Sequence, residues 1–244
     1  MINKFRFKKC AFIALLCALA SICCFALCSC GEGESVKKYD YLVFFDTETT
    51  GLDPERDHIT ELAAIKVVKE EEQGRVTNII SSLLKLPEGV VIPEFLEKLT
   101  GITNEVIREE GRDWSEVYEE FTTLFEKDKK GLVIAYNAQF DLMFMQHQFL
   151  AFKELDVDYL DSLTVFREIE AYPHKLSDAI NRFKLQGCIN SHCAADDTAA
   201  LIMVTEALSN RCNLLDYVNR FGYVPKYGKP KKIDKIKYFP QNRR

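Results

Sequence analysis

The order of its apolar segments most constrains what this chain can fold into. Five runs rich in β-branched and aromatic residues are expected to form strands: residues 41–45, 59–68, 76–86, 132–136 and 157–163. Apolar residues recur at helical spacing in other segments: residues 94–100, a short stretch from residue 104, 114–125, 140–152, 174–183, 194–208 and 214–221. Three strands followed by strands that alternate with helices predict an α/β fold, a mixed sheet flanked by helices.

Charge divides the chain into three parts. Residues 1–30 carry a net charge of +4 and residues 226–244 carry +7, so the total of −5 leaves −16 on the residues between them. A length of 244 residues suits one domain with extensions. We therefore distinguish an N-terminal segment (residues 1–35), a central domain (36–224) and a basic tail (225–244). A body this acidic would hold a polyanion through metal ions and a few local cations.

The N-terminal segment has the composition of a signal or membrane anchor. Residues 10–31 contain no charged residue and exceed the ~20 residues that a membrane-crossing helix needs. The sequence up to Cys30 also resembles a bacterial lipoprotein signal, in which that cysteine would be lipidated. Alternatively, translation starts at Val36 and the protein is cytoplasmic. The three thiols of the body, at Cys188, Cys193 and Cys212, favour a reducing compartment, so the localisation stays open.

The basic tail has little periodicity and allows two interpretations. It is either a solvated extension, or a segment that guides a nucleic-acid strand or docks on a partner.

Four carboxylates stand at the ends of predicted elements. Asp46 and Glu48 end the first strand, where alternation puts both side chains on one face. Asp141 begins an apolar helix, and Asp197 lies in the first turns of another, with His192 on the loop before it. A single such acid is better explained as a helix cap or an exposed strand end. Together they suggest a metal site, because four clustered carboxylates stay ionised only beside cations. Oxygen ligands favour two divalent ions, Mg²⁺ or Mn²⁺.

Three motifs carry a family resemblance. F-D-T-E-T-T-G from Phe45, Y-N-A-Q-F-D from Tyr136 and H-C-A-A-D-D from His192 resemble, in this order, the three exonuclease motifs of the DEDD superfamily. This is the group of the proofreading epsilon subunit of bacterial DNA polymerase III. The resemblance covers residues 39–210. His192 stands five residues before Asp197, as in the superfamily's His branch, and Cys193 occupies the position of the other branch's tyrosine.

The resemblance implies an RNase H-like fold with a mixed five-stranded sheet flanked by helices. It also implies a metal-dependent 3′→5′ exonuclease that releases nucleoside 5′-monophosphates from DNA or RNA, with a single-stranded 3′ end, DNA favoured, as its partner. The expected catalytic residues are four metal ligands and one general base: Asp46, Glu48, Asp141, Asp197 and His192. An imidazole suits the role of base near neutral pH.

Substrate contacts are expected from four further residues in or beside the motifs: Thr47, Thr49, Leu52 and Asn137. Leu52 matches a position that in relatives wedges beside the terminal base, although a core leucine is an equal alternative. Tyr136 departs from the histidine of many relatives, which we expect to alter local packing only.

Two other functions remain open at this point. One is a non-catalytic nucleic-acid-binding or polymerase-associated module, with a polymerase subunit or, through residues 10–31, a membrane as partner. The other is an RNase H-like endonuclease or transposase-type enzyme, which shares the carboxylates without the His192 spacing.

Overall fold

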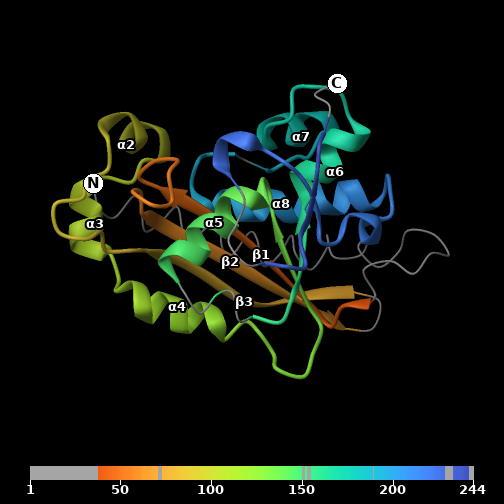
Figure 1. The fold of residues 1–244 in the computed structure, drawn as a ribbon, viewed down its shortest axis with the longest axis horizontal. Helices are drawn as coiled ribbons and strands as arrows, with labels where there is room; N and C mark the ends of the chain where they lie inside the picture. The colour runs from red at the N-terminus through yellow and green to blue at the C-terminus, as the bar shows by residue number, and fades with distance from the viewer. Residues whose placement is uncertain are drawn as a thin grey trace.

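A five-stranded sheet forms the centre of the fold (Figure 1). The computed structural model describes residues 38–70, 73–149, 152, 155–188, 190–228 and 233–241. The strands, in sheet order, are β3 (Gln73–Leu83), β2 (Ile59–Glu70), β1 (Tyr41–Thr49), β4 (Gly131–Ala135) and β5 (Asp158–Asp161). β1, β2 and β3 pair antiparallel, while β1, β4 and β5 run parallel. The predicted mixed five-stranded sheet is confirmed.

Helices cover both faces of the sheet because β1 alternates between two apolar cores. Tyr41, Val43 and Phe45 share one core with α4 (Trp114–Thr122) and α5 (Ala138–Gln148). Leu42 and Phe44 share the other with α6 (Ser162–Ile169), α7 (Leu176–Phe183) and α8 (Ala194–Ser209). Two short helices, α2 (Glu94–Thr100) and α3 (Asn104–Glu110), follow β3. Residues on the C-terminal half of β1 can therefore meet groups from helices on either face.

The structure corrects the sequence prediction at β5. The strand ends at Asp161 instead of continuing to residue 163, and the chain enters α6, a helix that was not predicted. Asp161 caps this helix by accepting hydrogen bonds from the Leu163 amide at 3.2 Å and the Thr164 hydroxyl at 2.6 Å. A buried aspartate therefore ends the strand where the apolar pattern alone would extend it.

The predicted helix at 214–221 is wrong in its second half. A 3-10 helix, η3 (Leu214–Tyr217), is followed by a short strand, β6 (Arg220–Gly222). Between them Asn219 adopts a left-handed backbone with φ 57°. Its amide donates to the Tyr159 carbonyl at 2.8 Å, and its side-chain oxygen accepts from the Tyr159 amide at 2.9 Å. Pairing with the edge of β5 thus replaces the helical hydrogen bonds.

Described residues of the basic tail pack on the domain. They form η4 (Pro225–Tyr227) and β7 (Lys237–Phe239), and β7 pairs parallel with β6. The Gln241 side chain donates to the Thr164 carbonyl at 2.9 Å, and the Gly222 amide donates to the Thr164 hydroxyl at 2.8 Å. Both strands are thereby tied to α6, so this part of the tail lies against the domain instead of extending into solvent.

The predictions for residues 1–35, including the apolar run 10–31, the lipidation site Cys30 and the start at Val36 just after it, lie outside the described residues. Between residues 38 and 241, none of the described helices has both the length and the apolar composition to span a membrane.

Candidate active site

β1 presents two of the predicted ligands on one face. Asp46 and Glu48 continue the face of Leu42 and Phe44, toward α8. Asp46 lies opposite Ala63 on β2, and Glu48 lies opposite Glu61. The pairing register shifts between Glu48 and Thr49, an irregularity that often occurs beside active sites. β1 thus ends in two neighbouring carboxylates.

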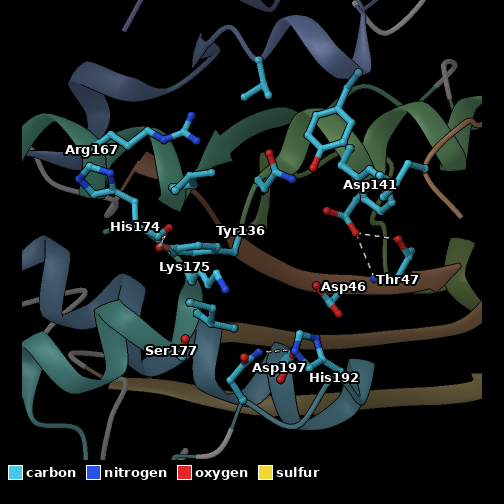
Figure 2. Close-up of a pocket in the computed structure, with 18 of the residues that line it drawn as sticks. Asp46, Thr47, Tyr136, Asp141, Arg167, His174, Lys175, Ser177, His192 and Asp197 are labelled. Carbon is cyan, nitrogen blue, oxygen red and sulfur yellow. Dashed lines mark hydrogen bonds between the residues drawn. The ribbon is translucent and has the colours of Figure 1, made fainter. Parts of the chain in front are cut away.

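Asp141 reaches this strand end from α5, on the other face. Only 2% of it is exposed, and its Oδ1 accepts from the Thr47 amide at 3.0 Å and the Thr47 hydroxyl at 2.7 Å (Figure 2). Asp161 holds the start of α5 because it accepts from the amides of Asn137 at 2.9 Å and Ala138 at 3.1 Å. Thr47, which was predicted to contact substrate, orients Asp141 through these two hydrogen bonds.

Asp197 and His192 come from the start of α8 and the loop before it. Asp197 accepts from the Asn190 side-chain amide at 2.7 Å and from the Ser191 backbone amide at 3.1 Å. His192 is exposed and has a left-handed backbone with φ 53°. Candidate ligand atoms of Glu48, His192 and Asp197 all lie within 4.8 Å of one another. Figure 2 shows His192 beside Asp197, with Asp46 nearby.

Burial raises the pKa values of all four carboxylates, and repulsion by neighbouring acids adds to the rise. The pKa of Glu48 rises to about 8, chiefly through burial and then through the charges of Asp197 and Glu61. Burial also raises the pKa of Asp141 and that of Asp197 to about 7 each, although hydrogen bonds from Thr47 and Ser191 oppose the rise. The pKa of Asp46 rises well above its ordinary value through burial and the charge of Asp141. Such a cluster of hard oxygen ligands fits divalent cations, which would neutralise it.

This cluster predicts an unusual pH dependence of stability. Without metal, the folded protein binds protons that the unfolded chain, with carboxyl pKa values near 4, has lost. This extra proton binding contributes stability that is fully present at pH values below the pKa of the unfolded chain. The contribution is lost as pH rises through the pKa values of the folded protein, about 7 to 8. The free energy of unfolding in EDTA should fall by up to ~1.4 kcal/mol per pH unit for each proton concerned.

Urea unfolding in EDTA or Mg²⁺ at pH 5 and pH 8 tests this. Mg²⁺ is expected to stabilise the protein more at pH 8, where the ligands bind it without first releasing protons. Equal stabilisation at both pH values would contradict the coupling of these carboxylates to metal.

Glu61 belongs to the site, although it was not predicted from the sequence. It is 1% exposed, faces Glu48 across the β1–β2 pair, and accepts from the Ala194 amide at the start of α8 at 3.0 Å. A carboxylate is favoured there by the positive end of the helix dipole. It thereby fixes the first turn of α8, directly after His192. The signal in the sequence was a single acid on the otherwise apolar alternation of residues 59–67.

Two substitutions at Glu61 should separate its charge from its hydrogen bond. Glu61→Gln and Glu61→Ala both remove the charge, but only glutamine retains an acceptor for the Ala194 amide. We expect the alanine variant to be less stable than the glutamine variant by about 1–3 kcal/mol, the usual effect of leaving a buried donor unpaired. Urea unfolding in EDTA measures the difference, and equal stability would show that the contact contributes nothing.

A pocket of about 770 Å³ surrounds these groups. Three of the four residues predicted to contact substrate line it, namely Thr47, Leu52 and Asn137. Leu52 is 62% exposed, so it is not a core leucine. Thr49 is buried, does not line the pocket, and donates its hydroxyl to the Gly51 carbonyl at 2.6 Å.

The far end of the pocket is basic, and the basic residues there were not among those predicted from the sequence. Figure 2 shows Arg167, His174 and Lys175 on the side away from Asp46 and Asp141. Tyr136 lies between these groups, and its hydroxyl donates to the His174 carbonyl at 2.9 Å. Within the described part of the chain, the Arg167 side chain forms no hydrogen bond or ion pair. A guanidinium in this state suits a phosphate oxygen.

Comparisons with known proteins agree with this geometry. The family model for the exonuclease family RNase_T matches residues 43–205. A PolC-type DNA polymerase III of Thermotoga petrophila is 30% identical over 165 residues, which are 66% of this chain but 11% of that protein. The DNA polymerase III subunit epsilon of Rickettsia conorii is 28% identical over 188 residues, 73% of this chain and 78% of that protein.

A solved structure shares the fold. The nuclease domain of 3'hExo, a DEDDh family member bound to rAMP, superposes with a TM-score of 0.60 at 16% identity, over 73% of this chain and 96% of that one. This likeness confirms the predicted RNase H-like fold, and the family match confirms that the chain is an exonuclease. Because the family model matches residues 43–205 and so spans all three motifs, the chain belongs to the RNase_T exonuclease family.

Proposed function

We propose that this enzyme removes nucleotides from the 3′ end of single-stranded DNA, and less readily RNA, as nucleoside 5′-monophosphates, using two Mg²⁺ or Mn²⁺ ions. The observation that carries the proposal is the meeting of four carboxylates and one histidine in a single pocket. The polymerase subunit from Rickettsia conorii supports DNA as substrate, and rAMP in the solved nuclease domain supports a nucleotide in such a pocket.

The carboxylates would hold the ions, with Asp46 and Glu48 on β1, Asp141 on α5 and Asp197 on α8. Thr47 keeps Asp141 directed at the strand end, while Asn190 and Ser191 keep Asp197 in position. Divalent ions, when bound, supply positive charge beside the attacking and leaving oxygens of a phosphodiester. Asp141 and Asp197 are thus held by hydrogen bonds before substrate arrives, which lowers the reorganisation that the reaction requires.

His192 would act as the general base. Its ring is exposed to the pocket and lies within 4.8 Å of ligand atoms on Glu48 and Asp197. It takes a proton from the water that attacks the terminal phosphodiester. The new P–O bond forms as the bond to the leaving 3′ oxygen breaks, and that oxygen takes a proton from solvent. At the other end of the pocket, Arg167 and Lys175 would contact phosphate oxygens of the strand.

Association with a polymerase is a further proposal, supported by the names of the relatives. This chain matches only 11% of the PolC-type protein, so partners that the rest of that protein binds are not implied. Attachment to a membrane through residues 10–31 or Cys30 stays a proposal from the sequence.

Linear and circular forms of the same single-stranded DNA test the proposal. The full-length protein with Mg²⁺ should digest the linear form to nucleoside 5′-monophosphates and leave the circle intact. Cleavage of the circle would instead indicate an endonuclease, and binding of the linear strand without any product would indicate a non-catalytic module.

A further inference from the structure

One wall of the pocket comes from outside the part of the chain that matches the exonuclease family. The family match ends at residue 205, whereas Val224, Lys226 and Tyr227 line the pocket that holds the carboxylates. Lys226 and Tyr227 belong to η4, where the predicted basic tail begins. The tail thus contributes directly to the surface that a substrate would meet.

Gln139 fixes this wall to the helix that carries Asp141. It is 1% exposed, and its side-chain oxygen accepts from the Val224 amide at 2.9 Å. Its side-chain nitrogen donates to the Val224 carbonyl at 3.0 Å and to the Gly228 carbonyl. A buried amide therefore holds the chain on both sides of η4. Because Gln139 lies two residues before Asp141, the wall keeps a defined position relative to the catalytic end of the pocket.

The wall presents an aromatic ring and a cation. The Tyr227 ring lies 5.2 Å from the Phe140 ring, between centroids, at an interplanar angle of 59°. The Lys226 ammonium nitrogen lies 4.4 Å from the centroid of the Tyr227 ring. Lys226 is exposed and forms no ion pair with any residue that the structure describes. Both groups line the same pocket as the carboxylates.

Proteins that bind single strands without sequence preference combine aromatic rings, on which bases stack, with cations that follow the backbone. We propose that Tyr227 and Lys226 bind the substrate strand upstream of its 3′-terminal nucleotide, the ring by stacking on a base and the ammonium by contacting a phosphate. The inference rests on the proposed nuclease function and adds a second set of strand contacts to those proposed for Arg167 and Lys175. It makes the start of the tail a determinant of affinity for a strand, separate from the chemical step.

Two substrates distinguish strand binding from chemistry. The p-nitrophenyl ester of thymidine 5′-monophosphate has a phosphodiester to cleave but no second nucleotide. A single-stranded oligothymidylate has a phosphodiester and further nucleotides upstream of it. Tyr227→Leu keeps an apolar contact with Phe140 but removes the aromatic face, and Tyr227→Phe keeps the face. We expect the leucine variant to raise KM for the oligonucleotide roughly tenfold and to hydrolyse the ester at the wild-type rate. The phenylalanine variant should resemble wild type on both substrates.

Salt dependence tests the ammonium. Lys226→Ala should reduce the slope of log Kd against log salt for the oligonucleotide by ~0.7, the value for one phosphate contact on a single strand. Binding is measured in EDTA with a fluorescent oligothymidylate. Lys237→Ala is the matched control, because Lys237 is an exposed lysine of the same segment that does not line the pocket.

The outcomes separate this inference from the proposed function. An unchanged KM for Tyr227→Leu, or equal slopes for Lys226→Ala and Lys237→Ala, would overturn the strand contact even if the enzyme is an active nuclease. Failure of the wild-type protein to hydrolyse either substrate would count against the proposed function itself. A thermal melt shows whether each variant remains folded, and a loss of ester hydrolysis by Tyr227→Leu would make its role structural.

Discussion

Replacing Asp46 by asparagine is expected to lower metal-dependent nucleotide release by about a thousandfold or more, while it stabilises the metal-free protein. A metal ion supplies several kcal/mol of transition-state stabilisation in phosphodiester hydrolysis, and ~4 kcal/mol corresponds to a thousandfold in rate. Without metal, the same carboxylate is buried beside the like charge of Asp141, and this burial raises its pKa. Asparagine carries no charge, so it removes both the cost of burying a carboxylate and the repulsion by Asp141 at pH values where Asp46 would otherwise be ionised.

Two measurements on the same variant are needed, the rate of mononucleotide release with Mg²⁺ and urea unfolding in EDTA at pH 8. Asp128→Asn is the matched control, since it makes the same chemical change at an exposed position outside the pocket. Wild-type turnover by Asp46→Asn would refute the assigned ligand set. Lost turnover together with lost stability would point to a folding defect instead.

Replacing His192 by asparagine is expected to lower kcat by about 10²- to 10⁴-fold, the usual contribution of a general base. Asparagine is the informative substitution because His192 has a positive φ, a conformation that asparagine adopts more readily than most residues. The backbone of the loop and the hydrogen bonds of Asp197 should therefore persist. Stabilisation of the folded protein by Mg²⁺ should change little, because the four carboxylates remain.

His147→Asn is the control for this substitution, as His147 is exposed on α5 and does not line the pocket. Turnover by His192→Asn within a few-fold of wild type would exclude His192 as the general base. A parallel loss of stabilisation by Mg²⁺ would instead assign His192 to metal binding, an arrangement that its distance from Glu48 and Asp197 permits.

Elements with a strong local signal could be predicted from the sequence. The alternation of β1 predicted correctly that Asp46 and Glu48 share a face, and the apolar runs predicted five strands in a mixed sheet. The ends of helices and strands were harder to predict from the sequence, because single polar residues determine them. Asp161 stops β5 and starts α6, and Asn219 turns a predicted helix into a strand by pairing with Tyr159.

The groups that support the site could not be found by periodicity. Glu61 acquires its role only when β2 pairs with β1 and α8 begins beside it, and no motif links it to residue 194. Gln139 lay inside a recognised motif, yet its function depends on a contact with residues 85 and 89 positions further along the chain. Such long-range hydrogen bonds form only in the packed fold. Local sequence patterns therefore could not predict the pocket wall formed by η4.

The most direct test of the central claim is incubation of the full-length protein with 5′-labelled single-stranded DNA and the matching RNA, in Mg²⁺, Mn²⁺ or EDTA. The pocket predicts a ladder that shortens from the 3′ end with either metal, that disappears in EDTA, and that forms faster on DNA. Labelled strands that stay intact in every metal, or that shorten equally in EDTA, would contradict a metal-dependent exonuclease site built from these carboxylates.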